Sequence, residues 1–159
     1  ISTAFSHFAE LPAQKNENID IISTTKLALE IFNEQNIIFQ SKLGSLNVKI
    51  DRTNLIRVIT NLVKNAIQAT ENIKDSKIIV SVKKLRNKAI IEIEDNGDGI
   101  PRKNRDKIFE PKFTTKSKGM GLGLSIIKNL VTNYNGKIDF VSKKGKTIFK
   151  IELPIHKNV

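Results

Sequence analysis

The stretch DNGDGIP, residues 95–101, decides how the rest of the chain is interpreted. It directly follows residues 88–94, which are rich in isoleucine as is typical of a β-strand. Gly97 and Gly99 permit backbone angles that a side chain would forbid, and they let a ligand approach the main chain closely. The stretch therefore predicts a tight turn at a strand end, either a plain one or one that encloses a ligand.

Asp95 lies where the predicted strand meets this turn. A carboxylate buried there needs hydrogen-bond donors, and the exocyclic amine of a purine is one such donor. Guanine carries a carbonyl at the position where adenine carries that amine, so the same carboxylate would reject guanine.

A second piece, NLVKNA at residues 61–66, lies on a helix that we expect to begin after Asp51 and to run to about residue 72. Asn61 and Asn65 are four residues apart, so they project from one helix face, one turn apart. Amide oxygens are hard ligands that suit Mg²⁺. The same spacing is equally that of two ordinary polar helix residues, and the pattern alone does not decide.

Two further pieces follow the glycine turn: FEPKFTTK at residues 109–116 and GMGLGL at residues 119–124. Residues 110–120 are expected to form a mobile loop, and Gly121 is expected to open a helix that runs to about residue 135. Backbone N–H groups at a helix start favour phosphate. A dinucleotide fold would need a strand before these glycines, whereas a loop rich in Lys, Thr and Ser precedes them.

The whole pattern predicts a two-layer α/β sandwich, with a mixed sheet packed against helices. Besides the two helices above, helices are expected over residues 23–36, capped by Ser23, and 102–109. Strands are expected over residues 18–22, 37–43, 46–50, 77–85, 88–94, 137–142 and 146–154.

Composition narrows the class of protein. The formal net charge is +11, but the lysines are spread along the chain, Trp is absent and aromatic residues are 6%. A base-stacking surface is therefore poorly supported, and no nucleic-acid partner is expected. The absence of cysteine excludes a thiol nucleophile. No apolar run reaches the roughly 18 residues of a spanning helix, so a cytoplasmic protein is expected.

In this order the four pieces resemble the N, G1, F and G2 boxes of the Bergerat-fold ATPases. Within that family the chain is similar to bacterial sensor histidine kinases of the nitrogen-regulation type. The resemblance runs from about Asp20 to Pro154, and FSHFAELP at residues 5–12 resembles the end of the second dimerisation helix. It implies three parts: a remnant of the phosphoacceptor helix (1–12), a linker (13–18) and the catalytic ATP-binding domain (19–159).

The resemblance implies ATP and Mg²⁺ as cofactors. It implies Asn65 as the Mg²⁺ ligand, Asp95 as the acceptor of the adenine amine, and Asn61, Asn65 and Lys116 as catalytic residues. Lys112 stays open between a phosphate contact and a solvated side chain, and Phe109 and Phe113 between lid anchors and simple packing residues. The implied ATP-binding residues are Asn61, Asn65, Asp95, Gly97, Gly99, Ile100, Phe109, Phe113, Thr115, Lys116, Gly119, Gly121, Leu122, Gly123 and Leu124.

The implied activity is transfer of the γ-phosphoryl group of ATP to a histidine on a dimerisation domain absent from this chain, with a response regulator downstream. In hydrolysing relatives a glutamate stands where this chain has Asn61, and an amide cannot accept a proton from water, which disfavours hydrolysis. His7 and His156 are expected to be surface residues, and the isolated chain is expected to be a monomer. A nucleotide-binding regulatory module with degraded catalysis is the alternative, and anchoring of the parent protein at the inner membrane stays open.

Overall fold

The computed structural model describes residues 15–111 and 123–155. Within them a five-stranded sheet has the order β2-β4-β5-β7-β6, and a two-stranded sheet pairs β1 with β3. Strand β2 runs parallel to β4, and the other neighbours are antiparallel. The strands are β1 Asn16–Asp20, β2 Ile37–Gln40, β3 Asn47–Asp51, β4 Ile78–Leu85, β5 Lys88–Asp95, β6 Lys137–Lys143 and β7 Lys146–Pro154.

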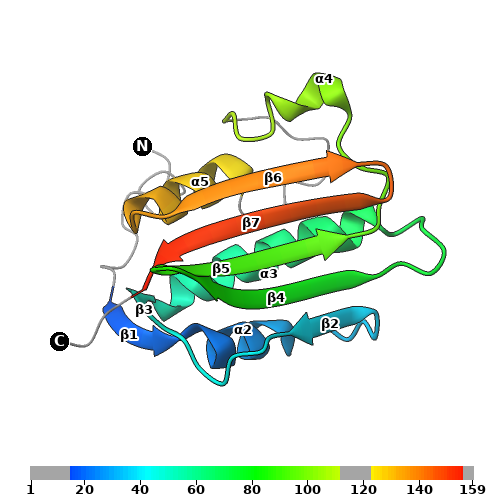
Figure 1. Cartoon of the computed structure of the whole chain (residues 1–159). Helices are drawn as coiled ribbons and strands as arrows, with labels where there is room; N and C mark the ends of the chain where they lie inside the picture. The colour runs from blue at the N-terminus through cyan, green and yellow to red at the C-terminus, as the bar shows by residue number, and fades with distance from the viewer. Residues whose placement is uncertain (1–14, 112–122, 156–159) are drawn as a thin grey trace, which may run out of the picture.

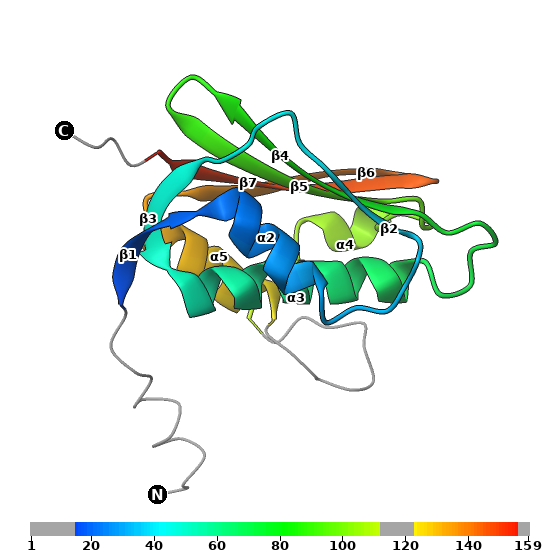
Figure 2. The same cartoon turned by 90° about the horizontal axis from the view of Figure 1, so that it is seen from below.

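The described helices are α2 Ile21–Leu29, α3 Arg52–Ala69, α4 Arg102–Arg105 and α5 Leu124–Asn133. Helices α2, α3 and α5 lie on one face of the five-stranded sheet (Figures 1 and 2). The expected two-layer α/β sandwich is therefore confirmed. None of the helices in residues 15–111 and 123–155 is long and apolar enough to cross a membrane.

Helix α3 forms the centre of the helical layer and begins where the sequence predicts. The Asp51 Oδ1 atom accepts a hydrogen bond from the Asn54 N–H at 3.1 Å, which satisfies one of the unpaired amides of the first turn. Its buried residues recur at helical spacing and pack against the inward side chains of the sheet. Each such side chain contributes roughly 1.5–3 kcal/mol on burial. On α3 they include Leu55, Ile59, Leu62, Val63 and Ala66.

The first helix differs from the prediction. Helix α2 begins at Ile21, not at Ser23, because the Asp20 Oδ1 atom accepts from Ile22 N at 3.0 Å and Leu46 N at 2.8 Å. It ends at Leu29 rather than at residue 36, since the following apolar residue, Ile31, is 63% exposed and has no core face to join. Strand β1 already begins at Asn16, so the last residues of the expected linker, 13–18, belong to a strand.

Two other helices are shorter than expected. Helix α4 covers Arg102–Arg105 instead of residues 102–109, and α5 begins at Leu124, with Gly123 as its N-cap, instead of at Gly121. Helix α5 ends at Asn133 because Asn135 adopts a left-handed backbone with φ 60°. Other boundaries moved by a few residues at most, and the β4–β5 turn lies at residues 86–87 as expected.

Candidate functional site

Asp95 is the last residue of β5, and its side chain is only 4% exposed. Its Oδ1 atom accepts a hydrogen bond from the Gly97 N–H at 2.9 Å. Burial raises the pKa of this carboxyl, against the opposing effect of the Gly97 hydrogen bond, and the nearby Glu94 charge adds to the rise. The carboxylate is thus a partly desolvated acceptor suited to a further donor.

Gly97 and Gly99 are glycines because the protein leaves no room for a side chain. A Cβ atom on Gly97 would lie 2.5 Å from the Ala69 carbonyl oxygen, at the end of α3. A Cβ atom on Gly99 would lie 2.7 Å from the Lys143 carbonyl oxygen, and its φ of +87° is one that side chains disfavour. The turn after Asp95 is therefore held between the end of α3 and the β6–β7 hairpin.

Asn61 and Asn65 lie on the helix that packs against this turn. Asn65 is half-buried and lies one helical turn before Ala69, about 6 Å along the axis. Asn61 lies one turn further back, is 9% exposed, and donates from Nδ2 to the Arg57 carbonyl oxygen at 2.7 Å. This bond turns the Asn61 amide oxygen away from the Arg57 carbonyl. The structure thus brings both asparagines to the helix that meets the glycine turn.

The donor chemistry fits Mg²⁺ bound together with a phosphate ligand. The described residues contain no group of three or more His, Cys, Asp or Glu side chains that could hold a metal by themselves. An amide oxygen supplies one hard ligand and leaves the other positions to phosphate oxygens and water, which is the coordination that Mg²⁺ usually takes. Asn65 could supply this amide oxygen, and its role as the Mg²⁺ ligand stays a prediction.

Phe109 lies in an aromatic cluster between α4 and the sheet. Its ring centroid is 6.0 Å from that of Phe140, which stacks at 5.7 Å on the buried Phe149. The Lys128 Nζ atom of α5 lies 5.1 Å from the centre of the Phe109 ring. The cluster fixes the chain that leaves α4 against β6 and α5. Whether Phe109 also anchors a lid stays a prediction.

Gly123 differs from the two glycines of the turn. Its φ is −68°, and among the described residues a Cβ atom there would meet only the Ser125 Oγ atom, at 4.0 Å. It precedes α5 without a side-chain cap, and Leu124, half-buried, packs against the core. Apart from Ile100, the remaining predicted site residues lie outside the described residues: Lys112, Phe113, Thr115, Lys116, Gly119, Gly121 and Leu122. His7 and His156 also lie outside them.

Two hydroxyl residues next to the turn were missed by the sequence interpretation. Thr147 is the β7 partner of Asp95, is 4% exposed, and its Oγ1 atom lies 2.8 Å from the Ser142 Oγ atom. The Ser142 Oγ atom in turn accepts from the Ile100 N–H at 2.8 Å. A signal was present for Thr147, because alternation along β7 places it on the buried face with Phe149 and other apolar residues.

Comparison with protein families gives a match over residues 50–157, to the family described as histidine kinase-, DNA gyrase B- and HSP90-like ATPase. The sensory histidine kinase/phosphatase NtrB of Vibrio alginolyticus is 33% identical over 158 residues, which cover 91% of this chain and 45% of that protein. The nitrogen regulation protein NtrY of Azorhizobium caulinodans is 30% identical over 144 residues, 85% of this chain and 18% of that protein. The chain spans less than half the length of these relatives.

Solved structures give the same likeness. The nucleotide-free catalytic domain of histidine kinase ThkA superposes with a TM-score of 0.81 at 30% identity, covering 89% of this chain and 97% of that domain. Histidine kinase ThkA in complex with the response regulator protein TrrA gives a TM-score of 0.80 at 26% identity, covering 96% of this chain and 46% of that one.

Proposed function

Because this chain belongs to the family of histidine kinase-, DNA gyrase B- and HSP90-like ATPases, we propose that it is the ATP-binding catalytic domain of a two-component sensor histidine kinase. Its two-layer sandwich is the Bergerat fold of that family. The domain binds ATP with Mg²⁺ and passes the γ-phosphoryl group to a histidine on a dimerisation domain. The whole activity belongs to a longer protein, which acts in the cytoplasm on a response regulator.

The observation that carries this proposal is Asp95, a buried carboxylate at a strand end beside a turn that its glycines keep closely packed. The Asp95 carboxylate accepts the exocyclic amine of adenine, and its burial makes the loss of that donor costly. The amine distinguishes adenine from guanine. The same carboxylate keeps its bond from the Gly97 N–H, so the base is oriented against a fixed group.

The remaining residues position the triphosphate. Mg²⁺, when bound, would neutralise charge on the phosphates. Asn65 would hold it through its amide oxygen, with Asn61 one turn away on α3. From the resemblance, Lys116 and the backbone of Gly119 to Gly123 are proposed to contact the phosphates; of these residues only Gly123 is described. Phosphoryl transfer demands mainly such positioning and charge neutralisation, and no described group is required as a nucleophile.

Trans-phosphorylation tests the proposal. The chain is incubated with ATP labelled at the γ-phosphate and Mg²⁺, and the histidine-bearing dimerisation domain of the parent kinase is then added. We expect acid-labile label on the added domain and none on this chain, and no label anywhere with Asn65→Ala. ATP binding without transfer to the added domain would favour the nucleotide-binding regulatory module instead.

The partners follow from the same proposal. The complex of ThkA with TrrA supports a response regulator as the downstream partner. The isolated chain is expected to be a monomer, since sensor kinases of this type dimerise through the helices of the phosphoacceptor domain. Nucleic acid is not proposed as a partner. Sedimentation of the chain alone checks the oligomeric state, and a stable dimer would contradict the expectation.

A further inference from the structure

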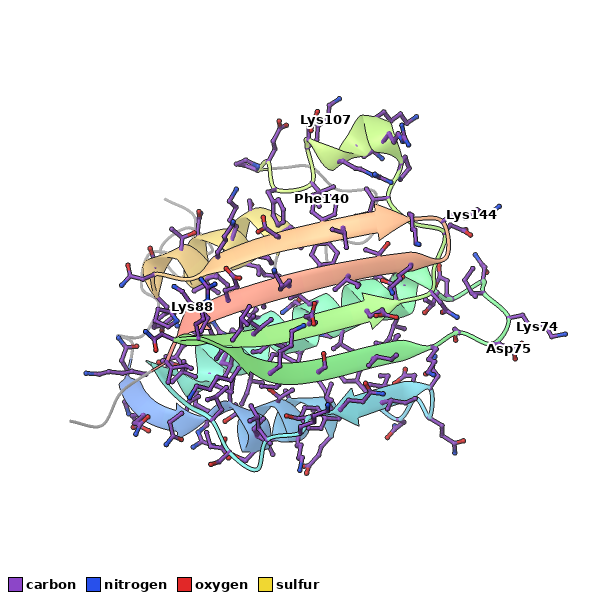
Figure 3. The ribbon with its side chains drawn as sticks, viewed as in Figure 1. Lys74, Asp75, Lys88, Lys107, Phe140 and Lys144 are labelled. Carbon is purple, nitrogen blue, oxygen red and sulfur yellow. The ribbon has the colours of Figure 1, made fainter. Side chains whose placement is uncertain are left out.

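The tip of the β6–β7 hairpin touches the glycine turn at three places. The Gly145 N–H donates to the Gly97 carbonyl oxygen at 2.8 Å. The Lys143 carbonyl lies against Gly99, where no side chain fits. The Ser142 Oγ atom accepts from the Ile100 N–H at 2.8 Å. Figure 3 shows Lys144 at this tip, at the end of the sheet where Lys74 and Asp75 also lie. The hairpin therefore contacts the turn along its length, from Gly97 to Ile100.

The turn is pinned at both ends by side chains of different strands. At its start the Asp95 carboxylate accepts from the Gly97 N–H at 2.9 Å. At its end Ser142, 42 residues further along the chain, holds the Ile100 N–H. The Ile100 carbonyl accepts from the Arg105 Nε atom at 3.0 Å, so both peptide groups of Ile100 are bonded. Only Asp98 and Gly99 lie between the two pins.

Ser142 is itself held by Thr147. The two hydroxyl oxygens are 2.8 Å apart, and Thr147 is the register partner of Asp95 across β5 and β7. Thr147 is 4% exposed, so its hydroxyl has few alternative partners in solvent. A continuous set of contacts thus links the strand position opposite Asp95 to the far end of the turn that follows Asp95.

We propose that Ser142 is a positioning residue for the nucleotide site: its hydroxyl, braced by Thr147, keeps residues 97–100 at a fixed place relative to the Asp95 carboxylate. The inference rests on the proposed function, because the quantity it explains is nucleotide affinity. A turn already held in its bound conformation binds without paying the entropy of ordering. When the Ser142 hydroxyl is removed, the Ile100 amide loses its acceptor and the end of the turn is released, while the Gly145–Gly97 bond remains.

Three variants test this role. Ser142→Ala removes the hydroxyl, and Ser142→Thr restores it on a side chain that also favours a strand. The matched control is Ser81→Ala, a half-buried serine on β4 between the inward-facing Val80 and Val82, and therefore on the other face of the sheet. Titration calorimetry with ATP and Mg²⁺ gives the dissociation constant and the stoichiometry of each protein. Amide hydrogen exchange gives the protection of Ile100.

For Ser142→Ala we expect ATP affinity to fall about 3- to 10-fold at full stoichiometry, and the Ile100 amide to exchange faster by a similar factor. Ser142→Thr should recover most of the affinity, and Ser81→Ala should match the wild type. A merely structural role would lower the stoichiometry through unfolding and leave the dissociation constant of the folded fraction unchanged.

The outcomes separate the two proposals. If the wild type binds ATP and Ser142→Ala binds it equally well, or if Ile100 exchange is unchanged in Ser142→Ala, the positioning role is wrong and the proposed function stands. If the wild type binds no ATP, the proposed function is wrong, and the positioning role that rests on it is wrong as well.

Discussion

Two glycine-containing segments of this chain differ in how closely other backbone atoms pack around their glycines. In the turn after Asp95, added Cβ atoms on Gly97 and Gly99 would lie 2.5 Å and 2.7 Å from backbone carbonyl oxygens. At the start of α5, Gly123 has an ordinary φ of −68°, and a Cβ atom there would lie 4.0 Å from its nearest neighbour in the part of the chain that the structure describes. The first two glycines are required by the protein's own packing, whereas nothing in the described residues requires Gly123.

This difference indicates which part of the proposed nucleotide site is also needed for the stability of the fold. The Asp95 turn is built by α3 and the β6–β7 hairpin, so damage there is expected to affect stability together with binding. Around Gly123 the described residues leave room for a side chain, so a substitution there is expected to act on binding more than on stability. Substitutions can therefore separate the two contributions.

The largest effect is expected from Asp95→Asn, measured on binding. The amide places a donor where one carboxylate oxygen faced the adenine amine, and a charge-assisted hydrogen bond is lost. ATP affinity should fall by roughly 2–4 kcal/mol, while the fold is kept because the amide oxygen can still accept from the Gly97 N–H. Calorimetry of the variant checks this, and undiminished ATP affinity would remove Asp95 from the site.

Gly97→Ala is expected to act on stability. Its methyl group would overlap the Ala69 carbonyl oxygen, so either the end of α3 or the turn must move. We expect the free energy of unfolding to fall by about 1–3 kcal/mol, measured by urea denaturation, with ATP binding lost in parallel. A variant as stable as the wild type would mean that the turn is not held by α3.

The pH dependence of stability distinguishes the buried carboxyl from the exposed surface. Burial raises the pKa of Asp95 above its ordinary 3.8, so its stabilising contribution is full below that value and is lost as pH rises through the folded-state pKa. Asp95→Asn should therefore gain stability relative to the wild type as pH increases from about 4 towards neutral. The lowered pKa values of Asp20 and Asp51 act in the opposite direction but are common to both proteins. A stability difference that does not change with pH would contradict the raised pKa.

The smallest effect on stability is expected from Gly123→Ala. Its methyl group would meet no atom of residues 15–111 or 123–155 closer than 4.0 Å, so the free energy of unfolding should change by less than about 0.5 kcal/mol. Under the proposed function, ATP affinity should nevertheless fall severalfold, because a methyl group on this exposed glycine hinders the approach of a phosphate to the backbone. If stability and ATP affinity fall together in Gly123→Ala, as is expected for Gly97→Ala, the proposed difference between the two segments is wrong.

Local signals in the sequence predicted most of what positions the site. The Asp51 cap of α3, the turn at residues 86–87 and the place of Asp95 at a strand end each depend on a few neighbouring residues. The same is true of the need for glycine at Gly97 and Gly99, although the sequence did not say which atoms exclude a side chain.

What escaped prediction depends on contacts between distant parts of the chain. Helix α2 starts early because Asp20 also binds the amide of Leu46, 26 residues away. Strands β2 and β3, near neighbours in sequence, pair with β4 and β1 in different sheets. Ser142 reaches the site only because the β6–β7 hairpin folds over a turn 42 residues earlier. No local periodicity carries such information.

The central claim is that Asp95 and its turn form an adenine site, and a paired titration tests it most directly. Wild-type protein is titrated with ATP and with GTP, each with Mg²⁺, under the same conditions. The buried carboxylate predicts saturable binding of ATP at one site per chain and GTP affinity weaker by roughly 2 kcal/mol or more, since guanine presents a carbonyl to an acceptor. Equal affinity for the two nucleotides would contradict the claim.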